Sequence, residues 1–117
     1  MKLSTISSAP FITLLGLVGS VSAGSRCIRQ KGSGDILHQV TMEGVGSENV
    51  GSLCKGLWDN LKRHPGCMVF RPNGCEEGNN KGELYWYFTT TMVCNSGMVH
   101  SAFWEATESR WGAINCE

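Results

Sequence analysis

The sequence predicts an α+β fold in two layers, in which two helices cover one face of a four-stranded antiparallel sheet. Three observations lead to this prediction: segments with strand-like alternation, two apolar stripes at helical spacing, and six cysteines in a short chain. The expected element order is strand, helix, strand, strand, helix, strand, which is the split βαβ arrangement (βαββαβ). Three disulfides are expected to stabilise a core of this modest size.

Residues 1–23 have the pattern of a secretory signal peptide. They combine a charged start, an apolar stretch from Phe11 to Val21, and small residues before an expected cleavage after Ala23. The apolar stretch is shorter than the ~20 residues that a membrane-spanning helix needs. We therefore expect residues 24–117 to form one secreted, extracellular domain without stable membrane insertion.

The first half of this domain is expected to contain one strand and one helix. Residues 24–35 are polar and rich in glycine, which indicates an extended arm. Apolar and polar residues alternate from Ile36 to Met42, as in a half-buried strand. Ser47 can cap a helix that Pro65 stops. Its apolar stripe consists of Val50, Leu53, Cys54, Leu57 and Leu61.

The second half is expected to contain three strands and one helix. A short strand covers 67–70, and a polar loop covers 71–82. The clearest strand is 84–94, which is rich in aromatic, β-branched and Thr residues. A helix follows between Asn95 and Gly112, and a last strand is expected over 113–116. The apolar stripe of the second helix consists of Val99, Ala102, Phe103 and Ala106.

The expected sheet also predicts the disulfide pairing. The right-handed crossover rule places the third strand between the first and second, and the fourth then lies beside the first. The start of the first strand and the end of the fourth share one end of the sheet, which pairs Cys27 with Cys116. The start of the second strand and the end of the third meet there too, which pairs Cys67 with Cys94. Cys54 in the first helix is left for Cys75 in the polar loop.

Composition excludes several classes of function. Ten Lys and Arg residues balance ten Asp and Glu residues, so no broad positive field attracts nucleic acid, and no nucleic-acid partner is expected. No Cys-x-x-Cys pair occurs and the histidines are scattered, so we expect no metal site. No phosphate- or dinucleotide-binding motif is present, and no cofactor is expected. We expect a monomer.

A catalytic role is one alternative. The three histidines, His38, His64 and His100, together with Glu43 and Arg71, would suit a small secreted ribonuclease-like hydrolase. Such an enzyme needs a general base, a general acid and a cation for the phosphate. His38 also fits a hydrogen-bonded ring inside the fold, because it lies on the inward side of its strand. We therefore assign no catalytic residue and expect no turnover.

A candidate binding surface lies on the outward side of the clearest strand. It consists of Tyr85, Tyr87, Thr89 and Thr91. With both helices on the other face, these side chains would meet solvent, where aromatic residues bind carbohydrate, single-stranded RNA or a protein. The alternative that we favour is that the arm at 24–35 or the loop at 71–82 covers them.

The segment 53–94 resembles the killer-toxin-like secreted proteins of fungi. Its helix runs into Arg63-His64-Pro65-Gly66-Cys67, and a polar loop then leads to Lys81-Gly82-Glu83-Leu84-Tyr85-Trp86-Tyr87 and Cys94. The ending, Gly112-Ala113-Ile114-Asn115-Cys116, is similar to that of the necrosis-inducing secreted effector domain of fungal plant pathogens.

Both resemblances imply a non-enzymatic effector or toxin with a virulence role, which binds a host or competitor protein or another cell-surface target. They assign no functional residue. A carbohydrate-binding protein of the host apoplast, using the tyrosine row, is a further alternative.

Overall fold

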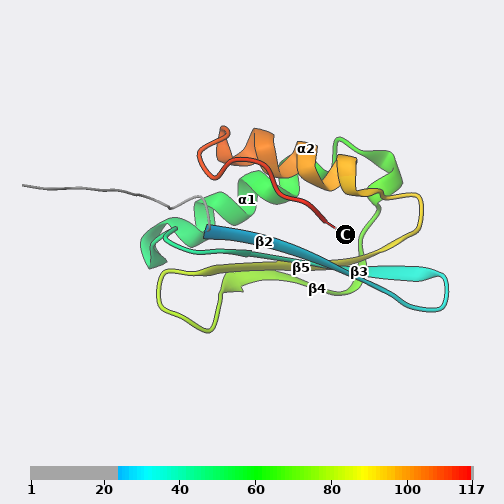
Figure 1. The fold of residues 1–117 in the computed structure, drawn as a ribbon, viewed down its shortest axis with the longest axis horizontal. Coiled ribbons are helices and arrows are strands. Elements are labelled where there is room, and N and C mark those ends of the chain that lie inside the picture. The colour runs from blue at the N-terminus through cyan, green and yellow to red at the C-terminus, as the bar shows by residue number, and fades with distance from the viewer. Residues whose placement is uncertain (1–23, 117) are drawn as a thin grey trace, which may run out of the picture.

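A computed structural model describes residues 24–116, so the leader expected at residues 1–23 lies outside the described part. A four-stranded antiparallel sheet carries two helices on one face (Figure 1). The sheet order is β2 (Ser25–Lys31), β3 (Asp35–Met42), β5 (Leu84–Thr91) and β4 (Phe70–Glu77). The helices are α1 (Val50–Leu61) and α2 (Ser96–Thr107). The predicted α+β class, with its four-stranded antiparallel sheet and two helices, is confirmed.

One edge of the sheet differs from the expectation. The strand beside β3 is β2, which comes from the segment that we expected to be an arm, and the observed order is strand, strand, helix, strand, strand, helix. A tight Gly32-Ser33-Gly34 connection makes this hairpin possible, because Gly34 adopts a φ of 93° that disfavours other residues. Residues 113–116 form no strand, because β2, which directly precedes β3 in the sequence, already pairs with that edge of β3.

The strand at the opposite edge of the sheet, β4, is longer than expected. Only Phe70 of the predicted strand 67–70 belongs to β4, which continues through the predicted loop to Glu77. A register shift between Phe70 and Asn73 accommodates Pro72, which cannot donate a ladder hydrogen bond. Proline is tolerated here because β4 is an edge strand. The connection to β5 therefore shortens to residues 78–83.

Both helices form where their apolar stripes predict them. The α1 stripe is buried, but Ser47 does not cap this helix; it lies in a short 3₁₀ turn, Ser47–Asn49, and its hydroxyl donates to Glu77 instead. The side chain of Asn95 caps α2 by accepting from the backbone N–H of Met98 at 2.9 Å. This helix ends at Thr107, before the expected stop at Gly112, because Glu108 adopts a left-handed conformation with φ 54°.

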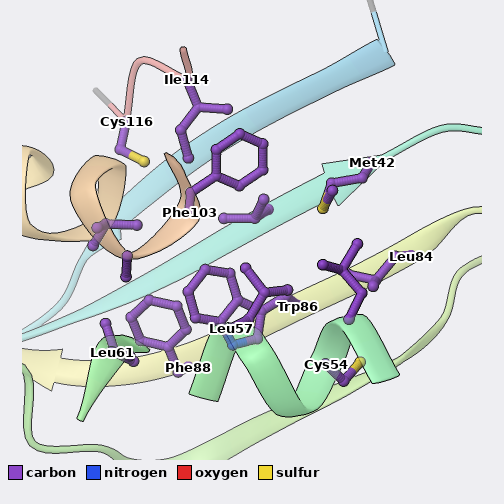
Figure 2. Packing of buried hydrophobic residues seen from close by; sticks show 14 of the residues in the cluster. Met42, Cys54, Leu57, Leu61, Leu84, Trp86, Phe88, Phe103, Ile114 and Cys116 are labelled. Carbon is purple, nitrogen blue, oxygen red and sulfur yellow. The ribbon is translucent and has the colours of Figure 1, made fainter. Parts of the chain in front are cut away.

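The core fills the space between the helices and the sheet (Figure 2). Alternation along the two central strands places one set of side chains opposite the outward tyrosine row, and these are buried: Ile36, His38, Val40, Met42, Leu84, Trp86, Phe88 and Thr90. Leu57 and Leu61 from α1 and Phe103 from α2 meet them from the helical layer. Met92 is the exception, at 61% exposed, because β5 ends at Thr91 rather than at the predicted Cys94.

Three disulfides connect Cys27 to Cys116, Cys54 to Cys75, and Cys67 to Cys94. These pairs match the expected pairing, although residues 113–116 are not a strand. The chain after α2 returns across the helical side, buries Ile114 and Cys116, and so reaches Cys27 on the inward side of β2. The indole N–H of Trp111 donates to the Glu43 carbonyl at 3.0 Å and holds this return in place.

Candidate functional site

The open face of the sheet, turned away from α1 and α2, is covered by no element of the described chain (Figure 1). The strand register arranges its side chains in three rows across the sheet. In strand order β2, β3, β5 and β4 these are Arg26, Thr41, Tyr85 and Glu76; Ile28, Gln39, Tyr87 and Gly74; and Gln30, Leu37, Thr89 and Phe70. Apolar atoms reach solvent here, since Ile28 is 50% and Phe70 46% exposed.

The cover that we expected over the tyrosines is therefore absent from the described residues. Segments 24–35 and 71–82 mostly extend the two edges of the sheet instead of lying over its face. The predicted binding residues have different environments: Tyr85 and Tyr87 are half-buried, and Thr91 is exposed at the end of β5. Thr89 is buried and donates its hydroxyl to the Pro72 carbonyl at 3.0 Å, so it offers little to a partner.

The two tyrosines form a stacked pair at the centre of the open face. Their ring centroids lie 4.9 Å apart with an interplanar angle of 26°. The side-chain amide of Gln39 donates to the Tyr85 hydroxyl at 2.7 Å. Tyr87 lies over Gly74 on β4, where an added Cβ would come within 2.6 Å of its hydroxyl oxygen. Glycine at this position therefore lets the ring rest directly on the neighbouring strand, and both rings are held in place.

A polar hollow of about 470 Å³ opens at one end of this pair. Arg26, Thr41 and Tyr85 form its wall on the sheet. The end of β4 and the connection to β5 close the other side, with Glu76 and Glu77 from the strand and Gly78, Asn79, Asn80 and Glu83 from the connection. Tyr87 is not part of the lining. Tyr85 thus stands between Tyr87 and the hollow.

Hydrogen bonds fix the connection that forms the rim of the hollow. The Glu77 carboxylate accepts from the Gly82 N–H at 2.6 Å and from the Ser47 hydroxyl at 2.5 Å. These two bonds, the Gly82 bond first, lower the pKa of Glu77 below its usual range. The Gly82 carbonyl accepts from the N–H groups of Val45 and Gly46, both at 3.0 Å. The rim is therefore tied to the segment that leads into α1.

The histidines proposed for catalysis do not form a site. His38 is fully buried between the sheet and the helices and stacks on Phe88 at 4.7 Å. His100 lies on α2 beside Trp104, and His64 follows the end of α1. A general base must reach its substrate, and buried His38 has no path to one. Within residues 24–116, no hydrogen bond or ring contact joins any two of the three histidines.

His38 is instead a neutral structural residue. Thr90 donates its hydroxyl to the Thr91 carbonyl at 2.9 Å, so it accepts a hydrogen bond from His38 Nε2 at 2.8 Å. This places the ring proton on Nε2 and leaves Nδ1 unprotonated. Burial, and then the positive charge of Arg29 on β2, lower the pKa of His38 from 6.5 to about 4.

We predict that this buried ring makes the fold sensitive to acid. The unfolded chain binds a proton at His38 below pH 6.5 while the folded protein resists it until about pH 4. Stability should therefore fall as the pH drops through this window, by about 3 kcal/mol for His38 alone. Urea unfolding of the wild type and of His38→Gln at pH 7 and pH 4 measures this loss. All other titratable groups are present in both proteins, so the difference between the two losses belongs to His38. Equal losses in the two proteins would contradict the assignment.

A second, apolar hollow of about 420 Å³ lies at the end of α1. Trp58, Leu61, Pro65, Cys67, Met68 and Val69 supply its apolar lining, and Lys62, His64 and Asn73 its polar edge. Of the four strands, only β4 contributes to its lining, through Asn73, and none of the open-face residues does. No group of three or more His, Cys, Asp or Glu side chains that could hold a metal ion occurs within residues 24–116.

Sequence reasoning missed several residues of the open face. Arg26 and Ile28 lie in the segment 24–35 that was expected to be an arm, and Gln39 lies in the strand expected over 36–42, where no binding residue was proposed. The signal that could have placed them is Gly32-Ser33-Gly34, a short turn followed by a strand, which is typical of a hairpin. With that hairpin recognised, Cys27 and Ile28 fall on opposite faces of an edge strand.

Comparison with known proteins finds no matching family model, no matching curated protein and no matching solved structure. No helix within the described range has the length and apolar character required to cross a bilayer.

Proposed function

We propose that this chain is a secreted binding protein of the effector or toxin type, which contacts a host or competitor target through its open sheet face and catalyses no reaction. The observation that carries the proposal is the stacked Tyr85–Tyr87 pair on a sheet face that no element of residues 24–116 covers. Tyrosine is enriched at contact surfaces because its ring supplies apolar area and its hydroxyl a hydrogen bond. Ile28 and Phe70 extend this surface to both edges.

Export is supported by the three disulfides, because such crosslinks persist mainly in oxidising compartments. The leader expected at residues 1–23 supports the same location. The resemblance to fungal killer toxins and necrosis-inducing effectors is the reason for proposing a target on a host or competitor cell. A rigid face also suits recognition, since little conformational entropy is lost when it binds.

The proposal is tested by applying the exported protein to leaf tissue and to cultures of competing fungi. We expect cell death or growth inhibition in one of the two. Ile28→Glu should reduce this response at least about tenfold, because it introduces a charge into the contact surface. The side chain is half exposed on an edge strand, so the variant should still fold.

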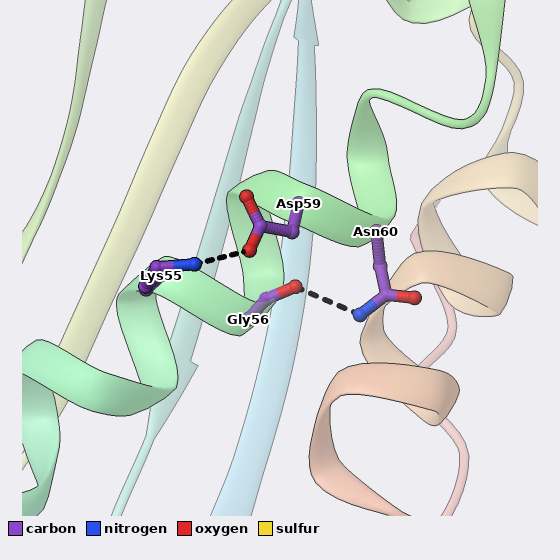
Figure 3. Close-up of polar contacts among 4 residues, drawn as sticks. All are labelled: Lys55, Gly56, Asp59 and Asn60. Atoms are coloured by element: carbon purple, nitrogen blue, oxygen red, sulfur yellow. Dashed lines mark hydrogen bonds and ion pairs between the residues drawn. The ribbon is translucent and has the colours of Figure 1, made fainter.

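The matched control lies on the other layer of the molecule. Lys55 and Asp59 form an exposed ion pair of 2.8 Å on α1, next to the bond from Asn60 to the Gly56 carbonyl (Figure 3). Lys55→Ala removes an exposed ion pair, which contributes little to stability because solvent screens it, and should leave the response unchanged. If the wild type is inert in both assays, the effector proposal is wrong. If Ile28→Glu is as active as Lys55→Ala, the open face is not the contact surface.

A further inference from the structure

We propose that the polar hollow beside Tyr85 binds a sugar residue of a cell-surface polysaccharide, in the form of a neutral or amino pyranose. This inference rests on the proposed function and names the chemical class of its target. It depends on three features of the hollow: an aromatic wall with one free side, polar side chains that have no partner among residues 24–116, and a rim that is already ordered.

The aromatic wall is Tyr85. One side of its ring packs against Tyr87, and its hydroxyl accepts from Gln39, so the ring is fixed in position. Tyr85 lines the hollow and Tyr87 does not, which leaves the other side of the Tyr85 ring for a ligand. A pyranose ring carries C–H bonds on its faces, and these pack favourably on the electron-rich face of an aromatic ring.

The polar lining suits the hydroxyl groups of a sugar. Within the described chain, neither Arg26 nor Glu76 has a side-chain hydrogen bond or an ion pair. Arg26 can only donate and Glu76 can only accept, while the Asn79 amide does both. A sugar hydroxyl is donor and acceptor at once, so it can use all three. The two remaining carboxylates already accept hydrogen bonds within the rim: Glu77 from the Gly82 N–H and Glu83 from the Asn80 N–H.

Size and charge narrow the ligand further. The volume of about 470 Å³ falls within the range of about 300–1,000 Å³ that small-ligand sites occupy. Three glutamates and one arginine line the hollow, so its charge is negative and repels an acidic sugar. A neutral or cationic sugar meets no such repulsion. The hydrogen bonds of Glu77 and Gly82 order the rim in advance, which lowers the entropic cost of binding.

The test is a titration of the isotope-labelled, disulfide-bonded protein, followed by two-dimensional amide NMR. The probes are a cello-oligosaccharide, an N-acetylglucosamine oligomer, a glucosamine oligomer and a galacturonate oligomer. We expect one or more of the first three to shift the amides of Arg26, Thr41, Glu76 and Tyr85, and the galacturonate oligomer to bind at least about tenfold more weakly.

Variants separate stacking from general stability. Tyr85→Ala should weaken binding at least about tenfold, whereas Tyr85→Phe keeps the ring and should change it less than about threefold. Glu76→Gln, on an exposed side chain, keeps the shape and should weaken binding about threefold or more, since it replaces a charged acceptor with a neutral amide. Lys55→Ala serves as the control, because Lys55 is exposed on α1 and does not line the hollow.

The outcomes distinguish this inference from the proposed function. The sugar site is wrong if none of the probes shifts the amide signals of the wild type. It is also wrong if Tyr85→Ala binds sugar as tightly as the wild type does. If no sugar binds but Ile28→Glu still abolishes the cellular response, the open face recognises another class of target and only the sugar site is wrong. If sugar binds while the protein is inert on cells, the sugar site stands and the effector proposal is wrong.

Discussion

Removing the Cys27–Cys116 disulfide by Cys27→Ala/Cys116→Ala is expected to lower the free energy of unfolding by about 4.5 kcal/mol. The two cysteines are 89 residues apart, so the crosslink closes almost the whole described domain into one loop. The entropy that a crosslink removes from the unfolded chain grows with the logarithm of loop length. This bond also anchors the return of the chain after α2, where Ile114 and Cys116 are buried.

The Cys54–Cys75 disulfide provides the comparison. It closes a loop of 21 residues, for which the same relation gives about 3 kcal/mol. Urea unfolding of Cys54→Ala/Cys75→Ala and Cys27→Ala/Cys116→Ala, followed by far-ultraviolet circular dichroism, measures both values. The longer loop should give the larger loss. A larger loss for Cys54→Ala/Cys75→Ala would show that packing around α1, and not loop closure, dominates.

Trp86→Ala is expected to cost about 4 kcal/mol of stability. Trp86 has no exposed surface and packs edge-on against Trp58 at 5.8 Å and beside Phe88 at 4.7 Å. Truncation of a buried tryptophan removes its apolar contacts and leaves a cavity, which typically costs ~3–5 kcal/mol. Trp86→Phe should cost less, about 1–2 kcal/mol. It retains a ring and removes an indole N–H that has no partner in the described chain.

Trp104→Ala is the matched control for this prediction. Trp104 lies on α2, is 40% exposed and contacts His100 on the outside of the helix. Its truncation leaves no closed cavity, so we expect a loss below about 1 kcal/mol. The same urea unfolding measurement applies to all three variants. Equal losses for Trp86→Ala and Trp104→Ala would contradict the placement of Trp86 at the centre of the core.

The local elements could be predicted because their signals are periodic and short-ranged. The stripe of α1 and the alternation of β3 and β5 are set by which side chains each stretch must bury, and neighbouring residues alone reveal it. The edge strands carry a weaker signal. Only one face of β2 packs against the core, and β4 contains Pro72 and Gly74, which are typical of loops. Their strand conformation comes from pairing with β3 and β5.

The candidate site depends on these edges, which is why it was only partly predictable. The outward direction of Tyr85 and Tyr87 followed from alternation along one strand. Whether anything covered them depended on where segments 24–35 and 71–82 went. The polar hollow combines Arg26 from one edge strand with Glu76 from the other, on opposite sides of Tyr85. No local pattern joins residues so far apart in the chain.

By itself, the sequence determined the fold class and the inward and outward sides of the central strands. These follow from burial of apolar side chains. The expected cysteine pairs are present, but Cys116 reaches Cys27 through the return of the chain after α2 and not through a fourth strand. Only the tertiary structure decided which segment forms each sheet edge, that His38 is sealed inside, and that a polar hollow adjoins the tyrosine pair. Edge pairing and loop position depend on contacts between distant residues, where several arrangements satisfy the same local pattern.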